Sequence, residues 1–262
     1  MSIICQGKFA KDNFIINYKR KRILQSNEAQ ILIESKWSNF LASNPQSFDG
    51  PLFRVDKYNI LKCENEINQI ELYLSDTDYK EFVGTRDSDF LDSFGQDNSA
   101  FPLSVGSILV TSDNNLVFGK RSSDIDAEKN TISVVAGYLD PRKDFVRTTY
   151  LDSDRWKIDI FCGIQREILE ETGIEPVNIV DLFCMGLIDN KQYRQMNIPF
   201  YASLNISAKE ITKMREKLTD TEFSGLLFIE NNKRSISRLK EMSANKFSDI
   251  IIPILEIYAI LF

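Results

Sequence analysis

Three glutamates within five residues are the feature of this sequence that most directly suggests chemistry. Glu167, Glu170 and Glu171 occupy positions i, i+3 and i+4 of the segment REILEETGI, residues 166–174. In a helix these positions share one face, where like charges repel each other unless a cation lies among them. Carboxylate oxygens are the ligands that Mg²⁺ and Mn²⁺ prefer, usually together with substrate phosphates. The spacing therefore predicts a metal site, with a solvated acidic face as the alternative.

The residues around the glutamates predict the helix that must position them. We expect it over residues 159–172, with Asp159 as its N-cap and an apolar side that includes Ile160, Ile164 and Ile168. Gly173 follows as the residue that lets the helix end.

Residues 166–174 resemble the second half of the Nudix box, G-x5-E-x7-R-E-U-x-E-E-x-G-U, in which U is aliphatic. Every specified position of that half is matched. The resemblance implies an α+β protein, a Nudix α/β/α sandwich here preceded by an N-terminal α/β extension. It also implies that Glu167, Glu170 and Glu171 bind Mg²⁺ or Mn²⁺ beside a diphosphate.

The first half of the box departs from this pattern. With Gly137 as the box glycine, the arginine should follow after fourteen positions, whereas Arg166 follows after 166 − 137 = 29. About fifteen extra residues thus lie within 142–157, and the first box glutamate would fall on Ile158. We expect Asp152, Asp154 or Asp159 to replace it beside Arg166 or the metal. Otherwise the insertion is better interpreted as a lid over the sugar.

A second resemblance covers the N-terminal hundred residues. Segments 44–54 and 78–85 are similar to the UDP-glucose and UDP-galactose pyrophosphatases of animals and plants, a Nudix subfamily with a long insertion at the same place. It implies hydrolysis of a UDP-sugar to UMP and a sugar 1-phosphate. Two alternatives remain open. One is hydrolysis of ADP-ribose or another nucleoside diphosphate compound. The other is a catalytically weak nucleotide-binding or regulatory module, which the missing glutamate favours.

The candidate site residues follow from these patterns. Those predicted for catalysis are Glu170, Glu171, Glu222 and Arg166. Arg166 is expected to bridge box carboxylates, and Glu222 precedes a strand where it is either a site carboxylate or a surface charge. Those predicted for substrate binding, outside the box as well as at its glycine, are Arg54, Tyr79, Lys80, Thr85, Lys120, Arg121 and Gly137.

Composition narrows the possible functions. The 262 residues carry a net charge of −6 and contain no histidine, which excludes imidazole bases and argues against a nucleic-acid partner. No apolar stretch is long enough for a membrane span, and no signal peptide is recognised. We therefore expect a cytoplasmic enzyme whose partner is a small nucleoside diphosphate substrate.

The two resemblances imply two domains. Residues 1–99 should form an α/β extension that selects the substrate, and residues 100–262 the Nudix hydrolase domain. In the extension we expect two short strands within 3–19, a helix over 27–42, a hairpin of strands 52–63 and 67–74, and a loop over 86–99. In the second domain we expect strands at 103–111, 115–121, 132–136, 180–187, 198–204 and 223–229, and helices at 207–218 and 250–262.

Overall fold

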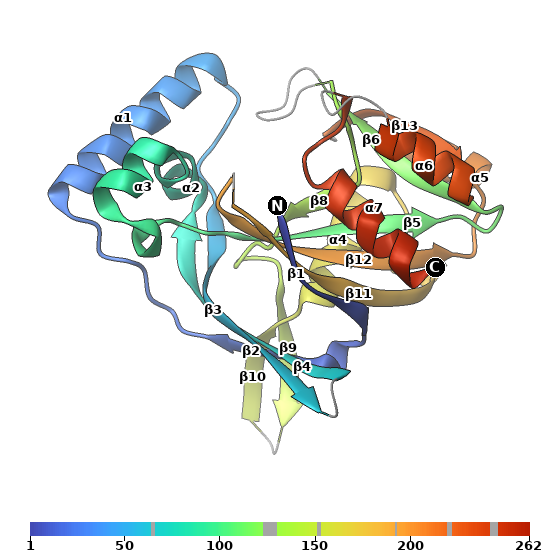
Figure 1. Cartoon of the computed structure of the whole chain (residues 1–262), viewed down its shortest axis with the longest axis horizontal. Coiled ribbons are helices and arrows are strands. Elements are labelled where there is room, and N and C mark those ends of the chain that lie inside the picture. Colours follow the sequence, from blue (N-terminus) through green and yellow to red (C-terminus); the bar gives the residue numbers. More distant parts are fainter. Residues whose placement is uncertain (64–65, 123–129, 151–152, 192, 219–221, 242–245) are drawn as a thin grey trace.

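A computed structural model describes the chain except for residues 64–65, 123–129, 151–152, 192, 219–221 and 242–245. The fold is α+β, as predicted, and its largest part is an eight-stranded mixed sheet (Figure 1). The strand order is β1 (Ser2–Phe9), β11 (Ile179–Asn190), β12 (Gln195–Leu204), β5 (Leu103–Val110), β6 (Asn115–Arg121) and β13 (Phe223–Glu230). The short strands β7 (Ile132–Ser133) and β8 (Val135–Tyr138) pair with β6 and β5. Strands β12 and β5 run parallel, and the other pairs are antiparallel.

Helices cover both faces of this sheet because its strands alternate between two apolar cores. On β5, Leu103, Val105 and Leu109 pack in the core that contains α4 (Ile160–Thr172). Ile108 and Val110 belong to the other core, with α6 (Lys233–Glu241) and α7 (Ile251–Leu261). The expected α/β/α layering is therefore present.

Helix α4 has the ends that the sequence predicts. The side chain of Asp159 accepts hydrogen bonds from the amides of Phe161 (3.0 Å) and Cys162 (3.3 Å). Gly173 takes the left-handed conformation, φ 76°, and its amide donates to Leu169. Helix α5 (Ala208–Arg215) begins with a capping box in which Ser207 and Glu210 bond each other's amides.

The N-terminal hundred residues build a second, three-stranded sheet. The long hairpin of β3 (Pro51–Cys63) and β4 (Glu66–Asp78) is joined by β2 (Phe14–Tyr18), which runs parallel to β4. Helices α1 (Asn27–Ser43), α2 (Tyr79–Thr85) and α3 (Ser88–Phe94) lie beside it (Figure 1). Because β1 is hydrogen-bonded to β11, the first strand of this region belongs to the large sheet. The division at residue 99 stays a prediction.

One expectation about a loop was wrong, and the insertion has regular structure. Residues 86–99, predicted as a loop, contain α3 and the short 3₁₀ helix Gln96–Asn98. Phe90 is fully buried against Ala29 and Ile33 of α1, so one apolar anchor holds a segment whose composition is otherwise polar. The insertion forms a hairpin of β9 (Phe145–Tyr150) and β10 (Ser153–Ile158). The Phe145 ring contacts Tyr18 and Phe53, which docks the hairpin on the N-terminal sheet.

Candidate active site

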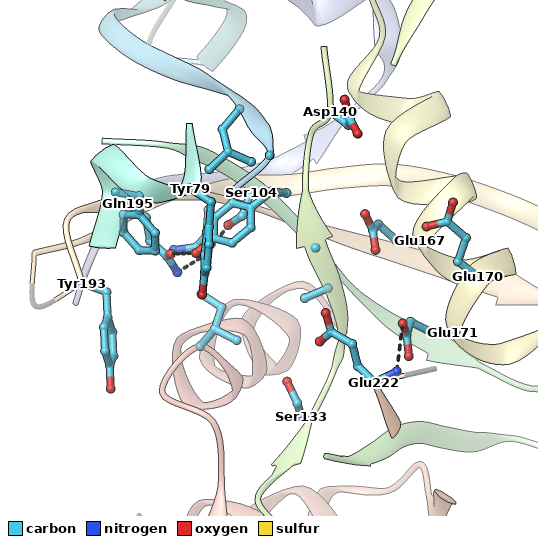
Figure 2. Close-up of a pocket in the computed structure, with 18 of the residues that line it drawn as sticks. Tyr79, Ser104, Ser133, Asp140, Glu167, Glu170, Glu171, Tyr193, Gln195 and Glu222 are labelled. Carbon is cyan, nitrogen blue, oxygen red and sulfur yellow. Dashed lines mark hydrogen bonds between the residues drawn. The ribbon is translucent and has the colours of Figure 1, made fainter. Parts of the chain in front are cut away.

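A cavity of about 590 Å³ lies where the large sheet, α4 and the N-terminal segment meet. Its volume is in the range of small-molecule sites. The predicted site residues that line it are Tyr79, Arg121, Gly137, Arg166, Glu167, Glu170, Glu171 and Glu222. Figure 2 shows the carboxylates of Glu167, Glu170 and Glu171 on one side of the view and Tyr79, Ser104 and Gln195 on the other. The two ends of the cavity thus differ in chemistry.

Arg166 connects the box carboxylates to the preceding loop. Its Nη1 atom lies 2.7 Å from Glu167 Oε1 and 3.0 Å from Glu170 Oε2. Its Nε and Nη2 atoms bind the two oxygens of Asp144 at 2.9 and 2.8 Å. These carboxylates keep the pKa of Arg166 above its usual value despite the effect of burial. The guanidinium is therefore a permanent cation that joins the loop to the helix.

Asp144 takes the place where the first box glutamate was expected. Its side chain is buried, and its Oδ2 also accepts the amide of Asp140 at 2.7 Å. The prediction is that at least one of Asp152, Asp154 and Asp159 lies beside Arg166 or the metal. Asp159 does not meet Arg166, because its carboxylate caps α4 and forms an ion pair with Lys11. The side chains of Asp152 and Asp154 lie outside the described residues.

A signal for Asp144 was present in the sequence. Counting forward from Gly137, the family glutamate falls at Lys143, one position before Asp144. Counting backward from Arg166 crosses the inserted hairpin and gives Ile158. The insertion thus follows the carboxylate position instead of preceding it.

Glu167 and Glu171 are buried acids. Burial raises the pKa of Glu167 to about 7, although the adjacent Arg166 opposes the rise. Burial, followed by the charge of Glu222, raises the pKa of Glu171 to about 7. Close packing against β8 also explains the box glycine, since a Cβ on Gly137 would overlap the carboxylate of Glu167.

Glu171 and Glu222 lie next to each other in the cavity. The Glu222 amide is 3.4 Å from Glu171 Oε1, as the dashed line in Figure 2 shows. The Glu222 carboxylate is 3.2 Å from Arg121. Glu171 Oε2 is buried and has no hydrogen-bond partner among the residues that the structure describes. An acceptor of this kind is costly to bury unless a ligand or cation meets it.

Four of the predicted substrate-binding residues are not among those that line the cavity. Arg54 bonds Asp56 and the carbonyls of Asp97 and Ser99. The Thr85 hydroxyl accepts the amide of Ala100 at 3.0 Å, and Lys80 pairs with Glu34 at 2.8 Å. Lys120 is exposed, because it alternates along β6 with Arg121, the residue that turns to the cavity. The first three therefore have structural partners within the N-terminal segment.

Sequence reasoning missed a group of neutral polar residues at the other end of the cavity. These residues are Ser104, Asn190, Gln195 and Asn197. They come from strands β5, β11 and β12, and no short motif joins them in the sequence. Polar side chains within otherwise apolar strands were the available signal. Tyr138, next to the box glycine, completes the group through a 2.7 Å hydrogen bond to Gln195.

The sequence is similar to curated proteins over most of its length. It is 25% identical over 241 residues to uridine diphosphate glucose pyrophosphatase NUDT22 of Bos taurus, covering 86% of this chain and 81% of that protein. The Homo sapiens protein of the same name is 24% identical over 226 residues, with 80% and 74% covered. Nudix hydrolase 9 of Arabidopsis thaliana is 24% identical over 213 residues, with 72% and 67% covered. No protein-family model matches the chain.

Solved structures show a weaker likeness. A NUDIX hydrolase from Nitrosomonas europaea matches with a TM-score of 0.41 at 14% identity, covering 60% of this chain and 88% of that chain. The crystal structure of an ADP compounds hydrolase matches with a TM-score of 0.39 at 11% identity, covering 82% and 95%. TM-scores this low do not support a family assignment. The family assignment depends on the sequence similarity and on the box residues.

Together, the box residues and the curated relatives support the predicted family, the Nudix hydrolases, which are pyrophosphohydrolases by class. Within that class, the chain resembles the proteins named uridine diphosphate glucose pyrophosphatase, as its N-terminal motifs predicted.

Proposed function

We propose that this chain hydrolyses the pyrophosphate bond of a UDP-sugar and releases UMP and a sugar 1-phosphate. The observation that carries the proposal is the row of box glutamates on α4, which faces one cavity together with the N-terminal segment that resembles UDP-sugar pyrophosphatases. In this reaction water adds to one phosphorus atom and the bridging P–O bond breaks. The chain must therefore orient a diphosphate and accept one proton from water.

The donor set fits a divalent cation, Mg²⁺ or Mn²⁺. Glu167, Glu170 and Glu171 offer hard oxygen ligands, and the unpartnered Oε2 of Glu171 is one of them. Bound there, such an ion would neutralise charge on the leaving phosphate and make water more acidic. Within the described part of the chain no three acidic side chains are yet close enough to enclose an ion. Arg166 forms ion pairs with both Glu167 and Glu170.

Glu170 is the residue that must move for such an ion to bind. Its side chain is 44% exposed and bonds both Arg166 and Lys143. Ion pairs of this exposed kind contribute about 1 kcal/mol or less, so the carboxylate can leave them at small cost. Arg166 then remains held by Asp144, and its role is to position the helix carboxylates.

The other roles follow from position. Glu171 and Glu222 adjoin each other in the cavity, and we propose that one of them accepts the proton from water. Arg121, beside Glu222, is the cation we assign to a substrate phosphate. Tyr79 and Gly137 complete the proposed substrate contacts, since both line the cavity.

Incubation with candidate substrates tests the proposal. UDP-glucose, ADP-ribose and NADH are supplied in turn with Mg²⁺, and the nucleoside monophosphate released is identified by chromatography. We expect UMP and glucose 1-phosphate in equal amounts from UDP-glucose, and no product when EDTA replaces Mg²⁺. AMP as the favoured product would assign the enzyme to adenine compounds instead.

One observation favours a second candidate, a catalytically weak nucleotide-binding module. Arg166 bonds two of the three glutamates, so the described carboxylates do not form a ready ion site. Tight binding of UDP-glucose with no turnover in Mg²⁺ or Mn²⁺ would support this candidate.

We also propose a cytoplasmic location. Cys5, Cys162 and Cys184 are free thiols, which suits a reducing compartment. No helix in the described ranges is long and apolar enough to cross a membrane.

A further inference from the structure

The end of the cavity that lies away from the box glutamates contains a row of neutral polar side chains of the sheet, with Arg86 nearby over the Phe82 ring. Strand register places Asn197 of β12 opposite Ser104 of β5, and Ser104 opposite Tyr138 of β8. Gln195 is two positions from Asn197 and so shares its face. Asn197 and Ser104 are 5% and 6% exposed, so these two members of the row are buried at the cavity wall.

Hydrogen bonds within the row determine which way its amides point. The Tyr138 hydroxyl donates to Gln195 Oε1 at 2.7 Å, and Gln195 Nε2 donates to Asn197 Oδ1 at 3.2 Å. The Ser104 hydroxyl donates to the same Asn197 oxygen. Burial raises the pKa of Tyr138, so its phenol remains a neutral donor. With two donors on its oxygen, Asn197 must present its NH₂ group elsewhere.

That NH₂ group has no partner in the part of the chain that the structure describes. Asn197 Nδ2 is buried and makes no hydrogen bond to any described residue. A buried donor left unpaired is destabilising, and a ligand that brings an acceptor would remove the penalty. The group that suits it is a carbonyl oxygen, whereas an exocyclic amino group would place donor against donor.

Aromatic rings beside the row favour a flat ligand. Tyr79, Phe82 and Tyr138 line the same cavity, with ring centroids 6.3 Å apart for Tyr79 and Tyr138 and 5.7 Å apart for Phe82 and Tyr138. Figure 2 shows Tyr79 near Ser104 and Gln195 and away from the glutamates. Nucleobases stack on such rings, and no charged side chain belongs to the row itself.

We propose that this amide row binds the base of the substrate and that Asn197 selects uracil over cytosine by donating to the O4 carbonyl. The inference rests on the proposed function in that it makes the uridine end of the substrate the occupant. Cytosine carries an amino group where uracil carries O4, so a donor at this position accepts one base and rejects the other. A site built to hydrogen-bond one group discriminates strongly against its replacement.

Binding of reaction products tests the proposal without any need for hydrolysis. Dissociation constants for UMP, CMP and glucose 1-phosphate are measured by calorimetry in Mg²⁺ for the wild type, Asn197→Asp and Asn205→Asp. Asn205 is an exposed residue directly after the end of β12 and does not line the cavity, so its substitution makes the same charge change outside the site. We expect the wild type to bind UMP at least tenfold more tightly than CMP. The ratio of the dissociation constant for CMP to that for UMP should fall at least tenfold in Asn197→Asp and stay constant in Asn205→Asp. The dissociation constant for glucose 1-phosphate should be the same in all three proteins.

Other results would overturn the assignment. Equal binding of UMP and CMP by the wild type would do so, and a preference for CMP would show that the hydrogen bonds run in the reverse direction. A loss confined to glucose 1-phosphate in Asn197→Asp would place the sugar in the row. If Asn197→Asp does not fold by circular dichroism, Ser104→Ala replaces it, because losing one donor frees the amide to turn and should weaken the preference severalfold. UMP selectivity without turnover of UDP-glucose would refute the proposed reaction but not this subsite.

Discussion

Replacing Asp144 by asparagine should destabilise the protein and lower its rate of UDP-glucose turnover. The substitution keeps the shape of the side chain but removes the charge that binds Arg166 through two hydrogen bonds of 2.9 and 2.8 Å. Losing one partner of a buried ion pair costs about 3–5 kcal/mol, but Arg166 keeps Glu167 and Glu170 and the new amide oxygen still accepts one bond. We therefore expect a loss of about 2 kcal/mol in the free energy of unfolding, in line with hydrogen bonds to charged groups.

Asp159→Asn is the matched control. Asparagine caps helices about as well as aspartate, so this variant loses the ion pair with Lys11, whose side chain is 63% exposed, and the weak hydrogen bond from the Cys162 thiol. Its expected cost is below about 1 kcal/mol. Urea unfolding followed by circular dichroism measures both variants, and UDP-glucose turnover is measured alongside, where only Asp144→Asn should show a reduced kcat. If Asp159→Asn is equally or more damaging in both assays, Asp144 does not replace the missing box glutamate.

Three further predictions address the carboxylates. Glu170→Gln or Glu171→Gln should lower kcat at least ~100-fold, about 2.7 kcal/mol of transition-state stabilisation, with the fold retained; near-normal turnover in both variants would remove the proposed metal site. Because the pKa of Glu167 and of Glu171 is about 7 in the fold against an ordinary 4.5, the folded state binds more protons than the unfolded state between these values. The free energy of unfolding of the metal-free protein should therefore fall as pH rises from 4.5 to 7, by up to about 3 kcal/mol per group. Added Mg²⁺ should restore this stability above pH 7. Melting temperatures that do not change over this pH range would contradict the assignment of Glu167 and Glu171 as buried acids. Gly137→Ala should displace the Glu167 carboxylate and reduce activity with the fold intact, whereas Gly225→Ala, where nothing lies within 4 Å of the new methyl, should leave activity unchanged; equal activity of the two variants in the UDP-glucose assay would show that Glu167 tolerates displacement.

The sequence by itself determined the features that depend on neighbours a few residues apart. The i, i+3, i+4 spacing of the glutamates, the Asp159 cap and the left-handed Gly173 are all local properties of one helix. Apolar segments likewise predicted strands of the large sheet, among them β5, β6, β11, β12 and β13, because the residues that form a strand are neighbours in the sequence. The box residues were enough to predict the family.

Only the tertiary structure decided which residues from distant parts of the sequence become neighbours. The partner of Arg166 could not be found by counting across a hairpin, because an insertion changes sequence distance without moving the carboxylate in space. The helix α3 depended on one buried ring, Phe90, whose anchor lies on α1. The amide row is assembled by the registers of three strands, β8, β5 and β12, and register is set by the packing of whole sheets. Residues such as Ser104 and Asn197, 93 positions apart, therefore became neighbours through the fold alone.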